Sequence, residues 1–165
     1  MALSNFELLC DNHLTDRAPL DAFKVVLLRA DGVRFDADPQ VFASLYDSRT
    51  GVWGDPISTS FTERRLVLSP SILVGKSLCW LIYGGGNNYI LVFDLAKNNL
   101  AQIDTPVDRL ITPKSRLQIL RMEDSGLGLA VLLGVSMQLW QGKASSNGGV
   151  GGRFRKTSNW TSSLH

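Results

Sequence analysis

The hydrophobic positions of this chain fall in short runs that turn residues separate. Through 75–106 the apolar runs SLCWLIY and YILVFDL are separated by GGGNN, and the shorter run LAQID follows AKNN. Apolar runs of this length, bounded by glycine and asparagine, predict an antiparallel meander of three strands. No segment longer than about ten residues places its apolar positions at the helical spacing. The pattern therefore predicts an all-β fold.

The same alternation of apolar runs and turns predicts further strands on both sides of this meander. They are expected over 22–30, 40–48, 52–53, 66–68, 116–123, 126–134, 136–143 and 153–158, with 57–70 mainly a connection. The first twenty residues are weakly patterned, although Ser4-Asn5-Phe6-Glu7 fits a capping box that would open one short helical turn. We therefore expect a short irregular N-terminal segment over 1–20, a β domain over 21–158 and a disordered tail over 159–165.

A repeat is visible in the third run of each set. The aromatic residues Tyr46, Phe93 and Trp140 follow one another at a constant step of 47 residues, and Trp53 and Leu100 lie seven positions after the first two. A step in the forties with about four strands per unit is typical of β-propeller blades. The runs VVLL, LCWLI, ILVF and LAVLL are apolar throughout, as in sheets that are covered on both faces.

Three such units would form an incomplete propeller, because closed propellers have four to eight blades. The first and last units would then each leave an apolar face exposed. Three outcomes follow from this expectation. The chain is part of a longer design, which is the interpretation we favour, or it pairs with itself, or it is poorly soluble.

Composition and charge exclude few functions by themselves. The 165 residues carry a net charge of +2 with only 19% charged residues, so no nucleic acid and no membrane is expected as a partner. The apolar runs are far shorter than the roughly 20 residues of a spanning helix. The N-terminus lacks the basic start and apolar stretch of a signal peptide. We therefore expect a cytoplasmic or nuclear protein whose Cys10 and Cys79 stay reduced.

The sequence predicts no catalytic, cofactor-binding or metal site. The glycines at 84–86 precede a strand rather than a helix and lack a following Lys-Ser/Thr pair, so they predict a hairpin turn and no phosphate loop. Cys10 and His13 are too few ligands for zinc, and Cys79 sits inside an apolar run. Asp47 and Asp94 are expected to accept hydrogen bonds from turn backbone, and they lie too far apart in the repeat to act as a paired acid and base.

The remaining conspicuous residues have structural interpretations. Tyr46, Trp53, Trp80 and Trp140 are expected to pack between sheets. The basic residues Arg153, Arg155 and Lys156 are expected on a solvated edge strand rather than against nucleic acid. The glycosylation acceptor pattern at 159–161 carries no meaning without a secretory signal, and His165 is the last residue.

Four phrases of the chain resemble the F-box-associated β-propeller of plant F-box proteins, especially the large grass family, which is kelch-like. The phrase LVGKSLCWLIYGG, followed by ILVFDLAKNNLAQIDTP, is the most specific of them. SLYDSRTGVWGDP, PLDAFKVVLLRAD and LWQGKASSNGGVGG resemble other phrases of the family, and the resemblance covers roughly 19–157. After the last phrase, GGRFRKTS stands where the family has an aromatic and aliphatic strand.

The resemblance implies a non-catalytic, substrate-recruiting module of a Skp/cullin ubiquitin ligase. Its partner would be an unknown substrate protein, bound by the loops at 31–39, 84–88 and 123–126, which we expect at one end of the blades. The ligase core would be a partner only with an F-box upstream, because 1–20 lacks the Leu-Pro-x-x-Leu start of that motif. The alternatives are a truncated or decoy product without independent function, and a propeller-type enzyme such as a hydrolase or oxidase.

Overall fold

All the regular structure that the computed structural model describes is β-strand, which confirms the all-β prediction. The described residues are 3–10, 22–31, 38–61, 67–83, 88–106, 116–124, 126–144 and 150–162. The chain divides into two compact units, Met1–Arg64 and Arg65–His165. Three antiparallel sheets account for the strands of both units, and we call them sheets 1, 2 and 3 in chain order.

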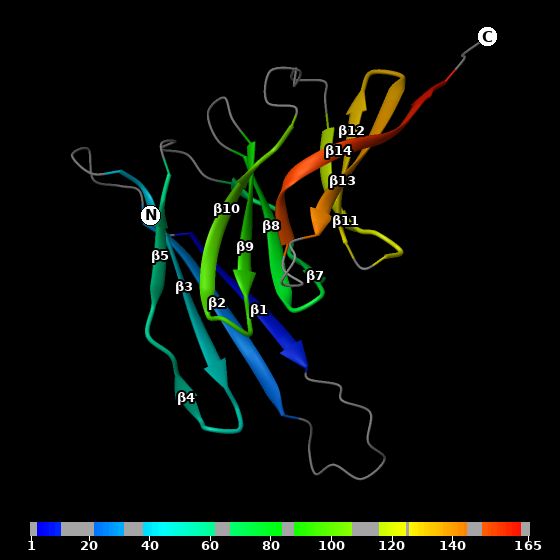
Figure 1. Ribbon diagram of the computed structural model, residues 1–165. Helices are drawn as coiled ribbons and strands as arrows, with labels where there is room; N and C mark the ends of the chain where they lie inside the picture. The colour runs from blue at the N-terminus through cyan, green and yellow to red at the C-terminus, as the bar shows by residue number, and fades with distance from the viewer. Residues whose placement is uncertain are drawn as a thin grey trace. The chain divides into compact units, whose positions relative to one another are not determined.

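Sheet 1 belongs to the first unit and is a meander in which neighbours in the sequence are neighbours in space (Figure 1). It consists of β1 (Leu3–Cys10), β2 (Phe23–Asp31), β3 (Gln40–Asp47), β4 (Val52–Trp53) and β5 (Ile57–Ser60). Strands β4 and β5 both pair with β3, so together they occupy one position of the sheet. The sheet therefore has four positions along its width.

The N-terminal expectation is wrong for the described part of 1–20. Leu3–Cys10 forms no helical turn; it pairs with β2 over its whole length, from Leu3 opposite Ala30 to Cys10 opposite Phe23. The segment Ile57–Ser60, expected as part of a connection, is also a strand. In both places the partner strand supplies the hydrogen bonds, and short-range pattern does not show such long-range pairing. Residues 11–20 lie outside the described residues.

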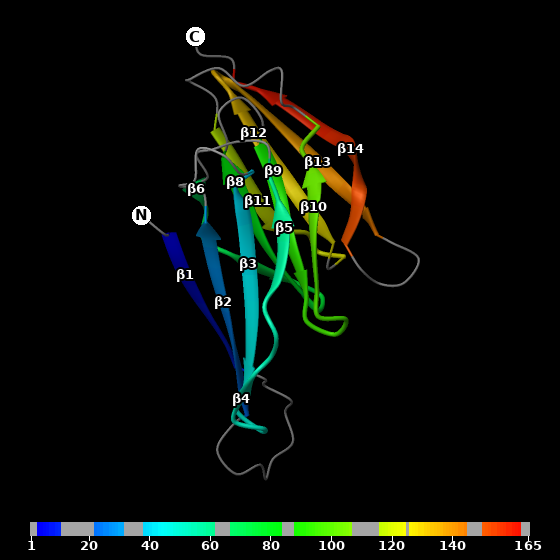
Figure 2. The same ribbon diagram turned by 90° about the vertical axis from the view of Figure 1, so that its left-hand side faces the viewer.

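Sheets 2 and 3 belong to the second unit, and each is again a sequential antiparallel meander (Figure 2). Sheet 2 consists of β6 (Val67–Leu68), β7 (Ile72–Val74), β8 (Ser77–Tyr83), β9 (Asn88–Asp94) and β10 (Asn99–Asp104), and both β6 and β7 pair with β8. Sheet 3 consists of β11 (Arg116–Arg121), β12 (Leu127–Leu133), β13 (Ser136–Ala144) and β14 (Val150–Thr161). Because β14 includes 159–161, the expected start of a disordered tail at 159 is wrong.

The repeat seen in the sequence is also a repeat of the structure. Tyr46, Phe93 and Trp140 lie on β3, β9 and β13, the third position of each sheet. The cross-strand partners of these residues also correspond, and the rows read Val25–Tyr46–Trp53, Leu78–Phe93–Leu100 and Leu129–Trp140–Lys156. We call the face of each sheet that carries this row its repeat face, and the other its alternate face.

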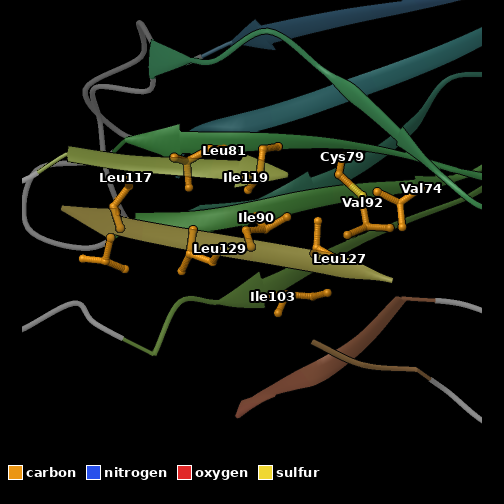
Figure 3. Close-up of a cluster of buried hydrophobic side chains, with 11 residues drawn as sticks. Val74, Cys79, Leu81, Ile90, Val92, Ile103, Leu117, Ile119, Leu127 and Leu129 are labelled. Carbon is orange, nitrogen blue, oxygen red and sulfur yellow. The ribbon is translucent and has the colours of Figure 1, made fainter. Parts of the chain in front are cut away.

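A core layer joins sheets 2 and 3 within the second unit (Figure 3). The alternate face of sheet 2 meets the repeat face of sheet 3, so side chains of both sheets point into one apolar layer. At one end of this layer the Tyr83 hydroxyl donates a hydrogen bond of 3.1 Å to the Leu117 carbonyl. The buried members of the layer are Val74, Cys79, Leu81, Ile90, Val92, Ile103, Leu117, Ile119, Leu127, Leu129 and Val131.

Sheet 2 differs from the other two sheets because both of its faces are buried. On its repeat face Trp80 and Phe93 are fully buried, as Leu81 and Ile90 are on its alternate face. Strands β2 and β12 bury one face only: Val26 and Leu129 are inaccessible, while Leu132 is 41% exposed. Burial on both faces is thus confirmed for LCWLI and ILVF in sheet 2. The runs VVLL in sheet 1 and LAVLL in sheet 3 are buried on one face only.

Sheets 1 and 2 have the same turn after the aromatic residue of the repeat. The Asp47 carboxylate accepts a hydrogen bond of 2.9 Å from the Arg49 N–H, and the Asp94 carboxylate accepts one of 2.9 Å from the Ala96 N–H. Four residues after each aspartate the chain has positive φ, at Gly51 (69°) and at Asn98 (49°). The predicted Asx-type turns are therefore confirmed, and both aspartates serve the backbone.

Two tight hairpins depend on a glycine with positive φ. Gly75 (φ 59°) opens the two-residue turn between β7 and β8, and Gly134 (φ 60°) opens that between β12 and β13. A positive φ at the first turn residue without one at the second, Lys76 or Val135, is characteristic of a type II′ hairpin. Nothing lies within 4 Å of a Cβ added at either position. Backbone conformation, and not space, therefore selects glycine here.

We expect Gly75→Ala and Gly134→Ala each to lower the free energy of unfolding by about 1 kcal/mol, because an L side chain is strained at positive φ. Urea denaturation measures the loss. Gly152→Ala is the matched control, since Gly152 has no positive φ and no atom within 4 Å of an added Cβ. A loss at Gly152 equal to that at Gly75 would contradict this explanation.

Candidate functional site

The described residues contain no group of three or more His, Cys, Asp and Glu side chains placed to hold a metal ion. Cys10 lies in β1, while His13, His165 and the glycines at 84–86 fall outside the described residues. Asp47 and Asp94 lie in different units, each with its carboxylate bonded to its own turn. The structure brings none of these sequence candidates together within the part of the chain that it describes.

Cys79 is a core residue, as predicted. Its side chain is fully buried between Ile72, Val92 and the rest of the layer that joins sheets 2 and 3. Burial disfavours the charged thiolate and raises the pKa of the Cys79 thiol from 9.0 to about 12. Burial therefore keeps this thiol in its neutral, weakly nucleophilic form at neutral pH.

In a Cys10→Ser background we expect the Cys79 thiol to react with a thiol reagent at pH 8 only when the chain unfolds. The same burial gives stability a pH dependence. Because the folded pKa is about 12 and the ordinary value is 9.0, the unfolded state releases its proton first, so the contribution of Cys79 to stability is constant below pH 9 and falls above it. Labelling rates with and without urea measure the first effect. Fast labelling of the folded chain would contradict the burial.

Two of the loops expected to share one end, at 84–88 and 123–126, follow strand ends that lie at opposite ends of the second unit. The link at 84–88 follows β8 at the end where Tyr83 contacts Leu117, the second residue of β11. The link at 122–126 follows the other end of β11. Tyr83 and Arg121, which precede the two loops, therefore lie at opposite ends of the second unit, while 84–87 fall outside the described residues, as does most of the third loop, at 32–37. The loop at 84–88 follows the second strand position of sheet 2, while that at 123–126 follows the first strand position of sheet 3. Successive strands of a meander run in opposite directions, so these two loops begin at opposite ends, and sequence spacing does not show which position a strand takes.

One end of the second unit instead carries three described turns, at 75–76, 95–98 and 122–126. The Leu95 N–H donates to the Lys76 carbonyl at 3.0 Å, which places the first two turns side by side. Asp124 holds the third turn closed, because its carboxylate accepts hydrogen bonds from the Gly126 N–H and from the Gln141 side chain. Lys76, Lys97 and Glu123 are exposed on these turns. We call this surface the turn end.

An aromatic group lies on the repeat face of sheet 1. The ring centroids of Phe23 and Tyr46 are 6.1 Å apart, and those of Tyr46 and Trp53 are 5.3 Å apart. Phe23 is 38% exposed and Trp53 is 46% exposed. On the same face the Arg29 guanidinium lies 5.3 Å from the centre of the Phe42 ring. This face thus presents aromatic side chains to solvent, where the sequence predicted packing of Tyr46 and Trp53 between sheets.

A second apolar row lies on the alternate face of sheet 3. Leu132, Met137 and Trp160 stand directly opposite one another on β12, β13 and β14, and they are 41%, 41% and 49% exposed. The row was not predicted from the sequence because Trp160 lies far along the chain from Leu132 and Met137. The available signal was the hairpin glycine Gly134, whose two-residue turn sets Leu132 opposite Met137.

The basic residues predicted on an edge strand lie on β14, which is an edge of sheet 3. Arg153, Arg155 and Lys156 are exposed, and the Lys156 ammonium stands 6.0 Å from the centre of the Trp140 ring. In sheet 3, Lys156 therefore takes the place that Trp53 holds in sheet 1 and Leu100 holds in sheet 2. One of these three cations, Lys156, thus contacts an aromatic ring of the same chain.

No helix long and apolar enough to span a membrane occurs among the described residues. Comparison of the chain with models of protein families, with curated proteins and with solved structures gave no match.

Proposed function

We propose that this chain is a non-catalytic protein-interaction module built from β-propeller blades, similar to the substrate-recruiting propellers of F-box proteins. The observation that carries the proposal is the agreement between the 47-residue aromatic step and the third strand of each four-position meander. The face-to-face packing of sheets 2 and 3 supports it, because blades bury their faces against neighbouring blades.

The turn end is the binding surface in this proposal. Hydrogen bonds to their own backbone hold the turns at 95–98 and 122–126, and the Leu95 N–H joins the first of these to the turn at 75–76. These bonds fix the turns without a partner. They present Lys76, Lys97 and Glu123, which offers both signs of charge to a polar protein surface. Sites on loops that a rigid scaffold positions are common in binding proteins.

A photo-crosslinking residue placed at Lys97 or at Glu123 tests the proposal in extracts of cells that express the chain. The matched control is Val135, an exposed turn residue at the other end of β12. We expect one discrete protein to be crosslinked from Lys97 and Glu123 but not from Val135. The purified protein should then bind the chain, and Glu123→Lys should weaken that binding by roughly tenfold. Equal crosslinking from all three positions would contradict the assignment of the surface.

A further inference from the structure

Sheets 2 and 3 show how sheets of this kind pack on one another. The repeat face of sheet 3, with Trp140, lies against the alternate face of sheet 2, with Val92 and Ile103. The contact is directional, because the repeat face of one sheet meets the alternate face of the other. It is also well buried, since Leu129 and Leu81 are inaccessible to solvent.

One face of each kind is left exposed to solvent elsewhere in the chain. The repeat face of sheet 1 exposes Phe23 and Trp53 beside the half-buried Tyr46. The alternate face of sheet 3 exposes the row Leu132, Met137 and Trp160. The chain therefore displays both halves of the contact that it already makes once between sheets 2 and 3.

We propose that a second copy of this chain covers these faces, with the repeat face of sheet 1 of one copy packed on the alternate face of sheet 3 of the other. A second copy fits because it carries an exposed alternate face for the exposed repeat face of the first copy. That is the same pairing of faces that joins sheets 2 and 3. The inference rests on the packing of the sheets and not on the proposed binding function. The resulting contact is head to tail, so it joins two different surfaces and generates either a closed ring or an open chain.

The residues of the two faces are those that stabilise protein interfaces. Tyr, Trp, Phe, Met and Arg are enriched at interfaces, and buried Trp residues carry a large share of binding energy. Trp53 on one face and Trp160 on the other are nearly half exposed in the single chain, so each has a large area to bury. We expect these two side chains to dominate the contact.

Charge predicts the salt dependence of this contact. Arg29 on the repeat face of sheet 1 and Arg116 and Arg155 on the alternate face of sheet 3 are exposed, and all are cationic. Added NaCl screens like charges, so self-association should hold or strengthen as salt is raised. An interface held by ion pairs would weaken instead.

Sedimentation equilibrium of the purified chain and of two variants, Trp53→Arg and Trp160→Arg, tests the proposal. Each variant breaks one of the two faces, and its far-UV circular dichroism and urea midpoint show whether it is folded. Val52→Lys is the matched control for sheet 1, because Val52 is exposed and adjacent to Trp53 in β4 but points to the opposite face. Val135→Lys, at the tip of the β12–β13 hairpin, is the control for sheet 3.

We expect the wild-type chain and both controls to associate, and each tryptophan variant to dissociate with a constant raised by roughly tenfold or more. An equimolar mixture of Trp53→Arg and Trp160→Arg should form a one-to-one dimer, because each variant retains the face that the other lacks. A monomeric wild-type chain, including one that associates only when another protein is added, would overturn the proposal. So would a Trp53→Arg variant that still self-associates, because sheet 3 would then pair with itself.

Discussion

Replacing Phe93 with alanine is expected to lower the free energy of unfolding by about 3–5 kcal/mol, the usual cost of truncating a buried aromatic residue. Phe93 is fully buried on the repeat face of sheet 2, between Leu78 and Leu100 of the neighbouring strands. Alanine would leave a cavity that strands paired on both sides cannot close. Equilibrium denaturation in urea, monitored by tryptophan fluorescence and by circular dichroism, measures the loss.

The repeat supplies a matched control for this substitution. Tyr46 occupies the equivalent position of sheet 1 but is only half-buried, so Tyr46→Ala removes less apolar area from the interior. We expect it to cost less than half as much as Phe93→Ala. Equal losses at the two positions would show that these positions of sheets 1 and 2 contribute equally to the core, which would contradict the difference in their burial.

Leu129→Ala is the second substitution with a large expected effect, about 2–5 kcal/mol. Leu129 is inaccessible to solvent and lies in the layer between sheets 2 and 3 (Figure 3). Its loss should weaken the packing of one sheet on the other as well as sheet 3 itself. Thermal or urea unfolding of the variant gives the magnitude.

Val135→Ala is the control in the same sheet, because Val135 is exposed at the tip of the β12–β13 hairpin and lies outside the row Leu132, Met137 and Trp160. We expect a change within about 1 kcal/mol, as for most exposed positions. A double variant of Leu129→Ala with Leu81→Ala should deviate from additivity, since residues of one packed layer share any cavity. Strict additivity of the two losses would place these leucines in separate cores.

The strands that carry a local signal were predictable from the sequence. SLCWLIY corresponds to β8 residue for residue, and the runs for β2, β3 and β13 match within one residue at each end. These strands are central in their sheets and pair with a strand on each side, so they are more buried and more apolar than edge strands. The aspartate turns were predictable as well, because Asp47 and Asp94 bond to backbone only two residues away.

The rest depends on contacts that are distant in the sequence. Leu3–Cys10 becomes a strand because β2 pairs with it, and its own residues fit a helical turn as well. Trp160 joins Leu132 and Met137 only through the pairing of β13 with β14, which contains a register shift. The lysine at position 156 opposite Trp140 depends on that same pairing. A fixed step along the sequence locates the repeated aromatic residues but not their partners in the last sheet.

The central claim is that sheet 2 forms the stable centre because it alone, among the described sheets, is buried on both faces. Native-state hydrogen exchange of backbone amides tests this directly. We expect the amides of Trp80, Leu81, Ile90 and Leu91 to exchange slowest, with an opening free energy equal to that of global unfolding. We expect those of β14, an edge strand with an exposed face, to open at lower free energy. Amides of β8 and β9 that exchange as fast as those of β14 would contradict the account.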